Sequence, residues 1–156
     1  MTTKIRAMST KPNKSIFLAD DDEDDCLLFE DALREVSTSA ELLTASDGVE
    51  LIDLMEKTVP PPPDVIFLDL NMPRKNGFEC LDYIRKTKAW EHIPIVIFST
   101  TGQEEMVRKV HEKGANFFIR KPGSFPKLKQ AIKQTLDIDW TKHSWTPARE
   151  NFHYQY

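Results

Sequence analysis

Side chains that can do chemistry follow four short apolar runs of the chain. Asp20 and Asp21 come after IFLA, Asp69 after VIFL, Ser99 after IVIF, and Lys121 shortly after NFFI. If brought together, the three carboxylates would repel one another unless a cation were bound, and Mg²⁺ accepts a few carboxylates while leaving positions open for phosphate oxygens. A lysine and a hydroxyl would supply charge and a hydrogen bond to the same phosphate. The set suits phosphoryl transfer, with one aspartate as the nucleophile.

The apolar runs alternate with longer amphipathic stretches, a pattern typical of strands connected by crossover helices in a parallel sheet. The expected strands are 16–19, 41–45, 65–68, 95–98 and 116–119. The expected helices are 24–36, 49–56, 77–88, 104–113 and 124–136. We therefore predict an α/β fold, a doubly wound (βα)5 three-layer sandwich with strand order 2-1-3-4-5.

This topology would bring the polar residues to one place. Ligands of doubly wound sheets bind outside the carboxyl ends of the strands, where the strand order reverses. With the first and third strands adjacent, Asp20, Asp21 and Asp69 would meet there. The acids at 22–25 are not needed for a cation, and we expect them at the start of the first helix, where the helix dipole favours negative charge.

Two other helix starts have cap signatures. TGQE at 101–104 has the form of a capping box, and GSFP supplies Ser124 as a cap with a proline in the first turn. Taken alone, Ser99 and Thr100 would be explained as caps of the fourth helix.

Composition sets broad limits on the function. The 156 residues suffice for one domain, with 40% hydrophobic and 29% charged residues, and the net charge of −4 argues against nucleic acid as the main partner. No apolar run is long enough for a membrane helix or a signal peptide, so we expect a cytoplasmic protein without membrane contact. Cys26 and Cys80 fall in expected helices without metal-ligand spacing, which favours buried free thiols in a reducing compartment.

Four segments, LADDDEDD, VIFLDLNMPRKNGFE, IPIVIFSTT and FFIRKP, resemble the receiver domain of two-component response regulators over 15–136. The resemblance implies a flavodoxin-like fold and a phosphoryl group accepted by Asp69. It also implies that Asp20, Asp21 and Asp69, together with the backbone carbonyl of Asn71, bind Mg²⁺, for which Mn²⁺ or Ca²⁺ would substitute. Lys121 would pair with the phosphoryl oxygens.

The same resemblance implies a switch. Ser99 matches the hydroxyl and Phe118 the aromatic residue that respond to phosphorylation. The family more often has threonine at the first position, and tyrosine is common at the second. The Lys121–Pro122 bond is expected to be cis, as is usual in the family. The chain would then be a signalling protein that catalyses its own phosphorylation and dephosphorylation, and not an enzyme acting on a separate substrate.

Two alternatives belong to other classes. The motif LDLN invites comparison with haloacid dehalogenase-type phosphatases, but Asn71 occupies the place of their acid/base aspartate, and an amide cannot transfer a proton in that role. The second alternative is a receiver-like binding module that works without phosphate.

The expected organisation is a flexible arm at 1–14, a receiver domain at 15–138 and an aromatic-rich tail at 139–156. The chain would be a stand-alone receiver, because the tail is too short for a DNA-binding unit. Within the family it most resembles the regulators paired with bacterial phytochromes. The phosphoryl donor would be a sensor histidine kinase or a histidine phosphotransfer protein. The tail carries five aromatic residues, Trp140, Trp145, Phe152, Tyr154 and Tyr156. They would anchor a partner or a homodimer, or fold back on the domain.

Overall fold

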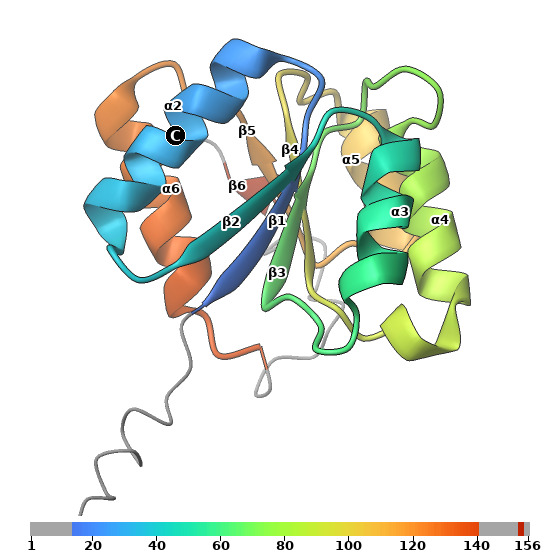
Figure 1. Ribbon diagram of the computed structural model, residues 1–156. Helices are drawn as coiled ribbons and strands as arrows, with labels where there is room; N and C mark the ends of the chain where they lie inside the picture. The colour runs from blue at the N-terminus through green and yellow to red at the C-terminus, as the bar shows by residue number, and fades with distance from the viewer. Residues whose placement is uncertain (1–13, 141–152, 155–156) are drawn as a thin grey trace, which may run out of the picture.

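The computed structural model describes residues 14–140 and 153–154, and it consists of one parallel sheet covered by helices on both faces (Figure 1). The strands are β1 (Ser15–Ala19), β2 (Glu41–Ala45), β3 (Val65–Leu68), β4 (Ile95–Ser99), β5 (Phe117–Arg120) and β6 (His153–Tyr154). The sheet has the order β2-β1-β3-β4-β5-β6. The predicted fold and the predicted order of the first five strands are therefore confirmed.

Within the described ranges, five α-helices connect or follow these strands. They are α2 (Glu23–Val36), α3 (Gly48–Thr58), α4 (Gly77–Lys86), α5 (Glu104–Glu112) and α6 (Phe125–Asp137), and a short 3-10 helix, η1, spans Lys88–Trp90. Helices α2 and α6 cover one face of the sheet, and α3, α4 and α5 cover the other (Figure 1).

Each central strand contributes to two cores because successive side chains of a strand point to opposite faces. Phe17 and Leu68 belong to the core under α3, α4 and α5, whereas Ile16 and Phe67 belong to the core under α2 and α6. In the second core the rings of Phe29, Phe67 and Phe98 contact one another edge to face, with centroids 4.9 to 5.9 Å apart. Burial on both faces explains why these strands are continuous apolar runs.

Most helix starts are capped by side chains. Asp22 accepts the Asp25 N–H at the start of α2, and Ser124 caps α6, both as predicted. The predicted capping box at 101–104 was wrong: α5 begins at Glu104 after Gln103, which makes no side-chain cap bond. A capping box occurs instead at α4, between Asn76 and Glu79. It follows that Ser99 and Thr100 do not cap α5.

The C-terminal segment adds an unpredicted strand. β6 lies parallel to β5, with Phe118 paired to His153 and Ile119 to Tyr154. Trp140 packs on Phe117 with the ring centroids 5.5 Å apart, so this tail aromatic contacts its own domain. The predicted arm at 1–14, apart from its last residue, and the tail aromatics Trp145, Phe152 and Tyr156 lie outside the described residues.

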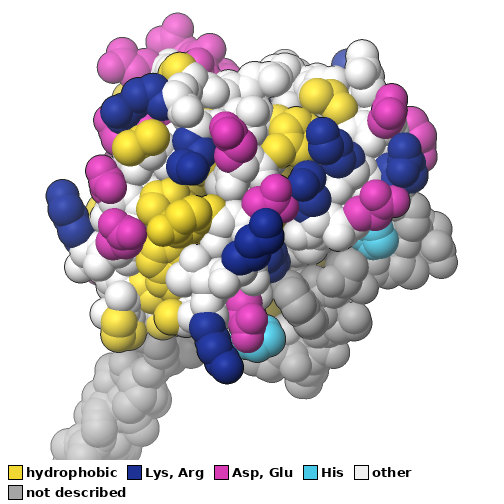
Figure 2. All heavy atoms as spheres, turned by 90° about the vertical axis from the view of Figure 1, so that its right-hand side faces the viewer, with side chains coloured by type: hydrophobic (Ala, Val, Ile, Leu, Met, Phe, Trp, Pro, Cys, Tyr) yellow, Lys and Arg dark blue, Asp and Glu magenta, His cyan; other side chains and the backbone are white. Residues whose placement is uncertain are grey.

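The surface over α3 and α4 carries basic and acidic side chains side by side, with no large area of one sign (Figure 2). A nucleic-acid partner would need a basic face, which this side of the molecule does not provide. None of the helices in the described ranges has the length and hydrophobicity needed to cross a membrane.

Candidate cation and phosphoryl site

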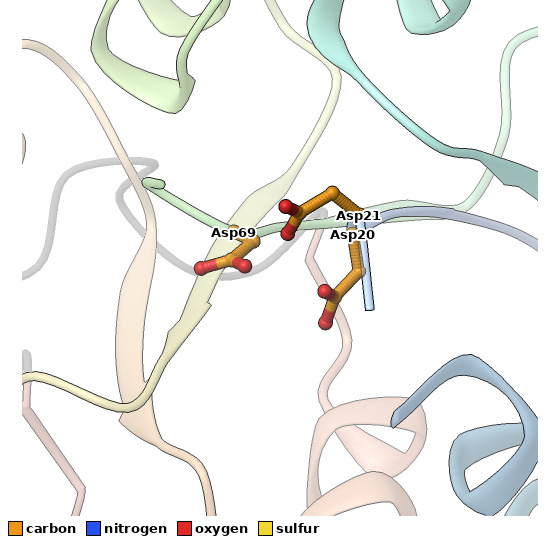
Figure 3. A group of neighbouring side chains, drawn as sticks. All are labelled: Asp20, Asp21 and Asp69. Atoms are coloured by element: carbon orange, nitrogen blue, oxygen red, sulfur yellow. The ribbon is translucent and has the colours of Figure 1, made fainter. Parts of the chain in front are cut away.

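Three carboxylates meet at the carboxyl edge of the sheet (Figure 3). Asp20 and Asp21 follow β1, and Asp69 follows the neighbouring β3. The sheet ladder continues past both strands, because the Asp69 N–H donates to the Ala19 carbonyl at 3.0 Å and the Asp20 N–H donates to the Ala45 carbonyl at 3.0 Å. The backbone therefore fixes where these side chains start, and one ligand oxygen from each of Asp20, Asp21 and Asp69 lies within 4.8 Å of the others.

These donors fit a hard divalent cation. Asp20 is 2% and Asp69 6% exposed, while Asp21 faces solvent, so a cation bound here would exchange part of its water shell for carboxylates. Ligands at about 2.1 Å from a common Mg²⁺ lie within about 4.2 Å of one another, a spacing that small side-chain rotations would reach. The Asn71 N–H makes a long contact of 3.5 Å with Asp69 Oδ1, so the chain after Asp69 turns back toward the same site.

Lys121 places a fixed positive charge among the acids. Its Nζ lies 2.7 Å from Asp20 Oδ2, 2.9 Å from Asp25 Oδ2 and 3.6 Å from Asp69 Oδ2. Its own N–H donates to the Ser99 carbonyl at 2.8 Å, which ties the lysine to the end of β4. Burial opposes the ammonium charge, but the hydrogen bonds to Asp20 and Asp25 outweigh it and raise the pKa of Lys121. The side chain therefore stays protonated throughout the physiological range.

Asp25 is a member of the site that the sequence did not reveal. It was predicted only as an acid at the start of a helix, and it does lie in the first turn of α2, but its carboxylate also binds Lys121. No sequence pattern distinguishes Asp25 from Asp24, because the side of α2 that faces β5 depends on how the helix packs. A neighbouring contact is the Cys26 thiol, 3.6 Å from the Asp20 carbonyl oxygen.

The acidity of Asp69 reflects its surroundings. Burial raises its pKa to about 6, the charge of Lys121 opposes the rise, and the charge of Asp20 adds to it. A neighbouring cation would favour the ionised carboxylate.

The raised pKa of Asp69 predicts a pH-dependent affinity for Mg²⁺. Ligand carboxylates must lose their protons to bind a metal, so protonation of Asp69 below about pH 6 competes with the cation. We expect the apparent Mg²⁺ dissociation constant to be flat from pH 8 to 7 and to rise progressively as the pH falls through 6, roughly tenfold per pH unit well below the pKa. Calorimetric titrations with MgCl₂ at several pH values would measure this. An affinity that does not change down to pH 5 would contradict it.

Ser99 and Phe118, the predicted switch pair, are both fully buried. The Ser99 Oγ has no hydrogen-bond partner among the described residues. Phe118 is 0% exposed and belongs to the core under α3, α4 and α5, so its ring is already turned inward. A buried hydroxyl without a partner is costly, which suggests that this donor is kept for a group that the protein itself does not contain.

Ser99→Ala is expected to stabilise the unphosphorylated fold, because it removes a buried polar group with no partner. We expect a gain of about 1 kcal/mol in the free energy of unfolding, since an unsatisfied buried group costs roughly 1–3 kcal/mol. Urea unfolding of the two proteins would measure the change. A clear loss of stability would show that the hydroxyl has a partner in solution.

One expectation about the site was wrong. The cis peptide bonds of the described chain are Val59–Pro60 and Pro60–Pro61, and Lys121–Pro122 is not among them. The cis expectation came from the resemblance alone. Because the two isomers of an X–Pro bond differ by only about 0.5–1 kcal/mol, no local sequence signal decides between them.

The fold and the site together define a doubly wound α/β protein with three carboxylates and a lysine gathered at the switch point of its sheet. Residues 16–133 match the family model of the response regulator receiver domain, and the chain belongs to this family.

Individual relatives are matched over nearly their whole length. The response regulator Rcp1 of Synechocystis sp. is 27% identical over 143 residues, which cover 89% of this chain and 97% of Rcp1. The solved structure of the phosphorylated cyanobacterial phytochrome response regulator RcpA has a TM-score of 0.74 and 29% identity, covering 87% of this chain and 99% of RcpA. The Mn²⁺-bound form of Rcp1 has a TM-score of 0.69 and 28% identity, covering 86% and 99%.

Proposed function

We propose that this response regulator accepts a phosphoryl group on Asp69 in a Mg²⁺-dependent reaction. The observation that carries the proposal is the meeting of Asp69 with Asp20, Asp21 and Lys121, because three carboxylates and one ammonium form a site for a cation and a phosphate together. The phosphorylated RcpA and the Mn²⁺-bound Rcp1 support the proposal as relatives.

The proposed donor is the phosphohistidine of a sensor histidine kinase or of a histidine phosphotransfer protein. An Asp69 oxygen would attack the phosphorus, the P–N bond to the histidine would break, and the histidine would leave as the imidazole after taking up a proton. Mg²⁺, when bound by Asp20, Asp21, Asp69 and the Asn71 carbonyl, would neutralise charge on the transferred oxygens. Lys121 would give up part of its contact with the acids and pair with the phosphoryl group.

The transferred group would complete the hydrogen bonding of Ser99. Its hydroxyl would donate to a phosphoryl oxygen, and this gain would favour the arrangement of the loop after β4 in which the two groups touch. Phe118 is already inside, so the phosphoryl group would stabilise the inward ring instead of drawing it in. The face formed by α5, β5 and α6 would carry the signal to a protein partner or to a second copy of the chain.

We place this activity in the cytoplasm, where kinase donor domains act. The free thiols of Cys26 and Cys80 suit a reducing compartment. We also propose that the chain is not an enzyme with a separate substrate, because the carboxylate that attacks is also the group that is modified.

Intact mass after incubation with acetyl phosphate tests the proposal. The wild type should gain one phosphoryl group in the presence of Mg²⁺ and none with EDTA, and Asp69→Asn should gain none under either condition. Asp31→Asn, which changes an exposed aspartate of α2, is the matched control and should be labelled like the wild type. Failure of the wild type to be labelled by acetyl phosphate or by a phosphorylated donor protein would favour the phosphate-independent binding module.

A further inference from the structure

The loop between β3 and α4 starts at the proposed phosphoacceptor and carries Asn71. It is anchored from inside by Leu70 and Met72, which are 1% and 8% exposed, and its end is tied back because the Gly77 N–H donates to the Leu70 carbonyl at 3.0 Å. Between these anchors the loop turns sharply at Arg74.

Arg74 has an uncommon backbone conformation. Its φ is 66°, and within the ranges 14–140 and 153–154 no other residue except glycine has a positive φ. The Lys75 N–H donates to the Pro73 carbonyl at 2.7 Å, so residues 73–75 form a γ-turn with Arg74 at its centre. A γ-turn of positive φ is rare and strained for a residue with a side chain, so it persists only where other contacts hold it.

The contact that holds this turn is made by the Arg74 side chain. Its guanidinium binds Asp47 with two nitrogens, Nε to Oδ2 at 2.8 Å and Nη2 to Oδ1 at 3.2 Å. The Asp47 side chain is only 10% exposed and also accepts the Glu50 N–H at 2.8 Å, which makes it the N-cap of α3. The hydrogen bond from Arg74 is the main reason that the pKa of Asp47 is lowered.

A second contact connects the β3–α4 loop to the start of α3. A Cβ added at Gly48, the first residue of α3, would lie 2.7 Å from the Lys75 Cβ, so the loop and the helix start touch without room for a side chain. The start of α3 is thus a rigid support for the γ-turn, connected by one ion pair and one close backbone contact.

We propose that Arg74 is a positioning residue of the cation site: by binding Asp47 it holds the β3–α4 loop in the strained turn that keeps Asn71 beside Asp69. This inference deepens the proposed function and rests on it, because it assigns a cause to the position of a metal ligand. It also links the site to α3, a helix that contributes no ligand of its own.

The direction in which the Mg²⁺ affinity changes when Arg74 is removed distinguishes a positioning role from an effect of its charge alone. Arg74 and Mg²⁺ are both positively charged and repel each other. If charge were the only effect, removing Arg74 would therefore make the nearby site bind Mg²⁺ more tightly. Loss of positioning has the opposite sign, because a carbonyl that moves freely must be ordered when the cation binds. Removing a residue that orients a metal ligand typically lowers the metal affinity about 10–100-fold.

Arg74→Asn is the decisive variant. Asparagine tolerates the left-handed region but cannot reach Asp47, so the turn stays allowed while its clamp is lost. We expect the Mg²⁺ dissociation constant, measured by calorimetric titration with MgCl₂, to rise about tenfold. We also expect the Asn71 amide signal in a ¹H–¹⁵N spectrum of the metal-free protein to broaden, because the loop then exchanges between arrangements, whereas a change of charge alone would shift the signal without broadening it. Arg74→Lys, which keeps the charge without the two-pronged contact, should restore part of the affinity.

Three controls make the result specific. Arg108→Ala removes an arginine with the same 56% exposed side chain from another ion pair, and it should leave Mg²⁺ binding unchanged. Asp47→Asn keeps the cap but loses the charge and should weaken binding. The double variant with Arg74→Asn and Asp47→Asn should bind Mg²⁺ no more weakly than the weaker-binding single variant, if both residues act through one ion pair.

The outcomes distinguish this inference from the proposed function. If the wild type binds Mg²⁺ and Arg74→Asn binds it as tightly or more tightly, with an Asn71 signal as narrow as that of the wild type, the positioning role is overturned and the proposed function stands. If the wild type binds no Mg²⁺ at all, the proposed function fails and this inference fails with it. Unchanged thermal unfolding of Arg74→Asn, together with weaker binding, would support the positioning role.

Discussion

Lys121→Met is expected to bind Mg²⁺ more tightly than the wild type while losing nearly all phosphoryl transfer. In the structure the ammonium occupies the space among Asp20, Asp25 and Asp69, at 2.7, 2.9 and 3.6 Å from their oxygens. A cation bound by the same carboxylates has to compete with it, so removing the lysine removes the competitor. The transferred phosphoryl group, in contrast, loses a charge partner that Mg²⁺ alone does not replace.

The same substitution should destabilise the metal-free fold. Taking one partner out of a buried ionic cluster typically costs about 3–5 kcal/mol, because the remaining charges are left without compensation. The pKa of Asp69 should rise above its value of about 6, since the charge of Lys121 holds it down. We therefore expect the variant to recover stability as the pH falls and Asp69 takes up a proton, and to recover it at neutral pH when Mg²⁺ is added.

Urea unfolding with and without Mg²⁺, together with calorimetry and acetyl phosphate labelling, would check both expectations. Lys129→Met is the matched control, because this lysine also makes a 2.9 Å ion pair, with Glu35, but away from the site. It should change stability by less than about 1 kcal/mol, as exposed pairs do, and leave Mg²⁺ binding as it is. Weaker Mg²⁺ binding by Lys121→Met would mean that the lysine orders the acids more than it competes with the cation.

The sequence predicted the site because strand ends are easy to locate. The runs before Asp20, Asp69 and Ser99 are buried on both faces, so they are continuous and apolar, and the polar residue that ends each one is conspicuous. Parallel topology then places all these ends at one edge of the sheet. The strands β1 to β5 therefore match the predicted ranges to within one residue at each end.

What the sequence did not predict depends on packing between distant segments. Asp25 joins the site only because α2 turns that side toward Lys121, 96 residues away in the chain. The two-residue β6 is too short for any periodicity, and it pairs with β5, which would otherwise be the edge strand of the sheet. At α5, Thr101 Oγ1 lies against Met106 Sδ at 3.7 Å and does not cap the helix. The strained turn at Arg74 likewise depends on Asp47, which is 27 residues away.

Gly77→Ala is expected to damage both stability and phosphorylation, because α4 begins in direct contact with the backbone after β3. A Cβ at position 77 would lie 2.7 Å from the Leu70 Cα and 3.1 Å from the Asp69 carbonyl carbon, and closer still to the Asp69 carbonyl oxygen. These are backbone atoms of the phosphoacceptor segment, so they cannot rotate aside as a flexible side chain would. Either α4 moves away from the sheet or Asp69 moves away from Asp20 and Lys121.

Both movements have a measurable result. Overpacking of this kind typically costs roughly 1–3 kcal/mol, and we expect a value near the upper end, about 3 kcal/mol, because the overlap is with backbone. A displacement of about 1 Å at Asp69 would lower the initial rate of acetyl phosphate labelling roughly 100-fold. Gly123→Ala is the matched control, since nothing lies within 4 Å of a Cβ added there, and it should match the wild type in urea midpoint and in labelling rate. If Gly77→Ala loses stability but keeps the wild-type labelling rate, the strain is taken up by α4 and the geometry of Asp69 is set by β3 alone.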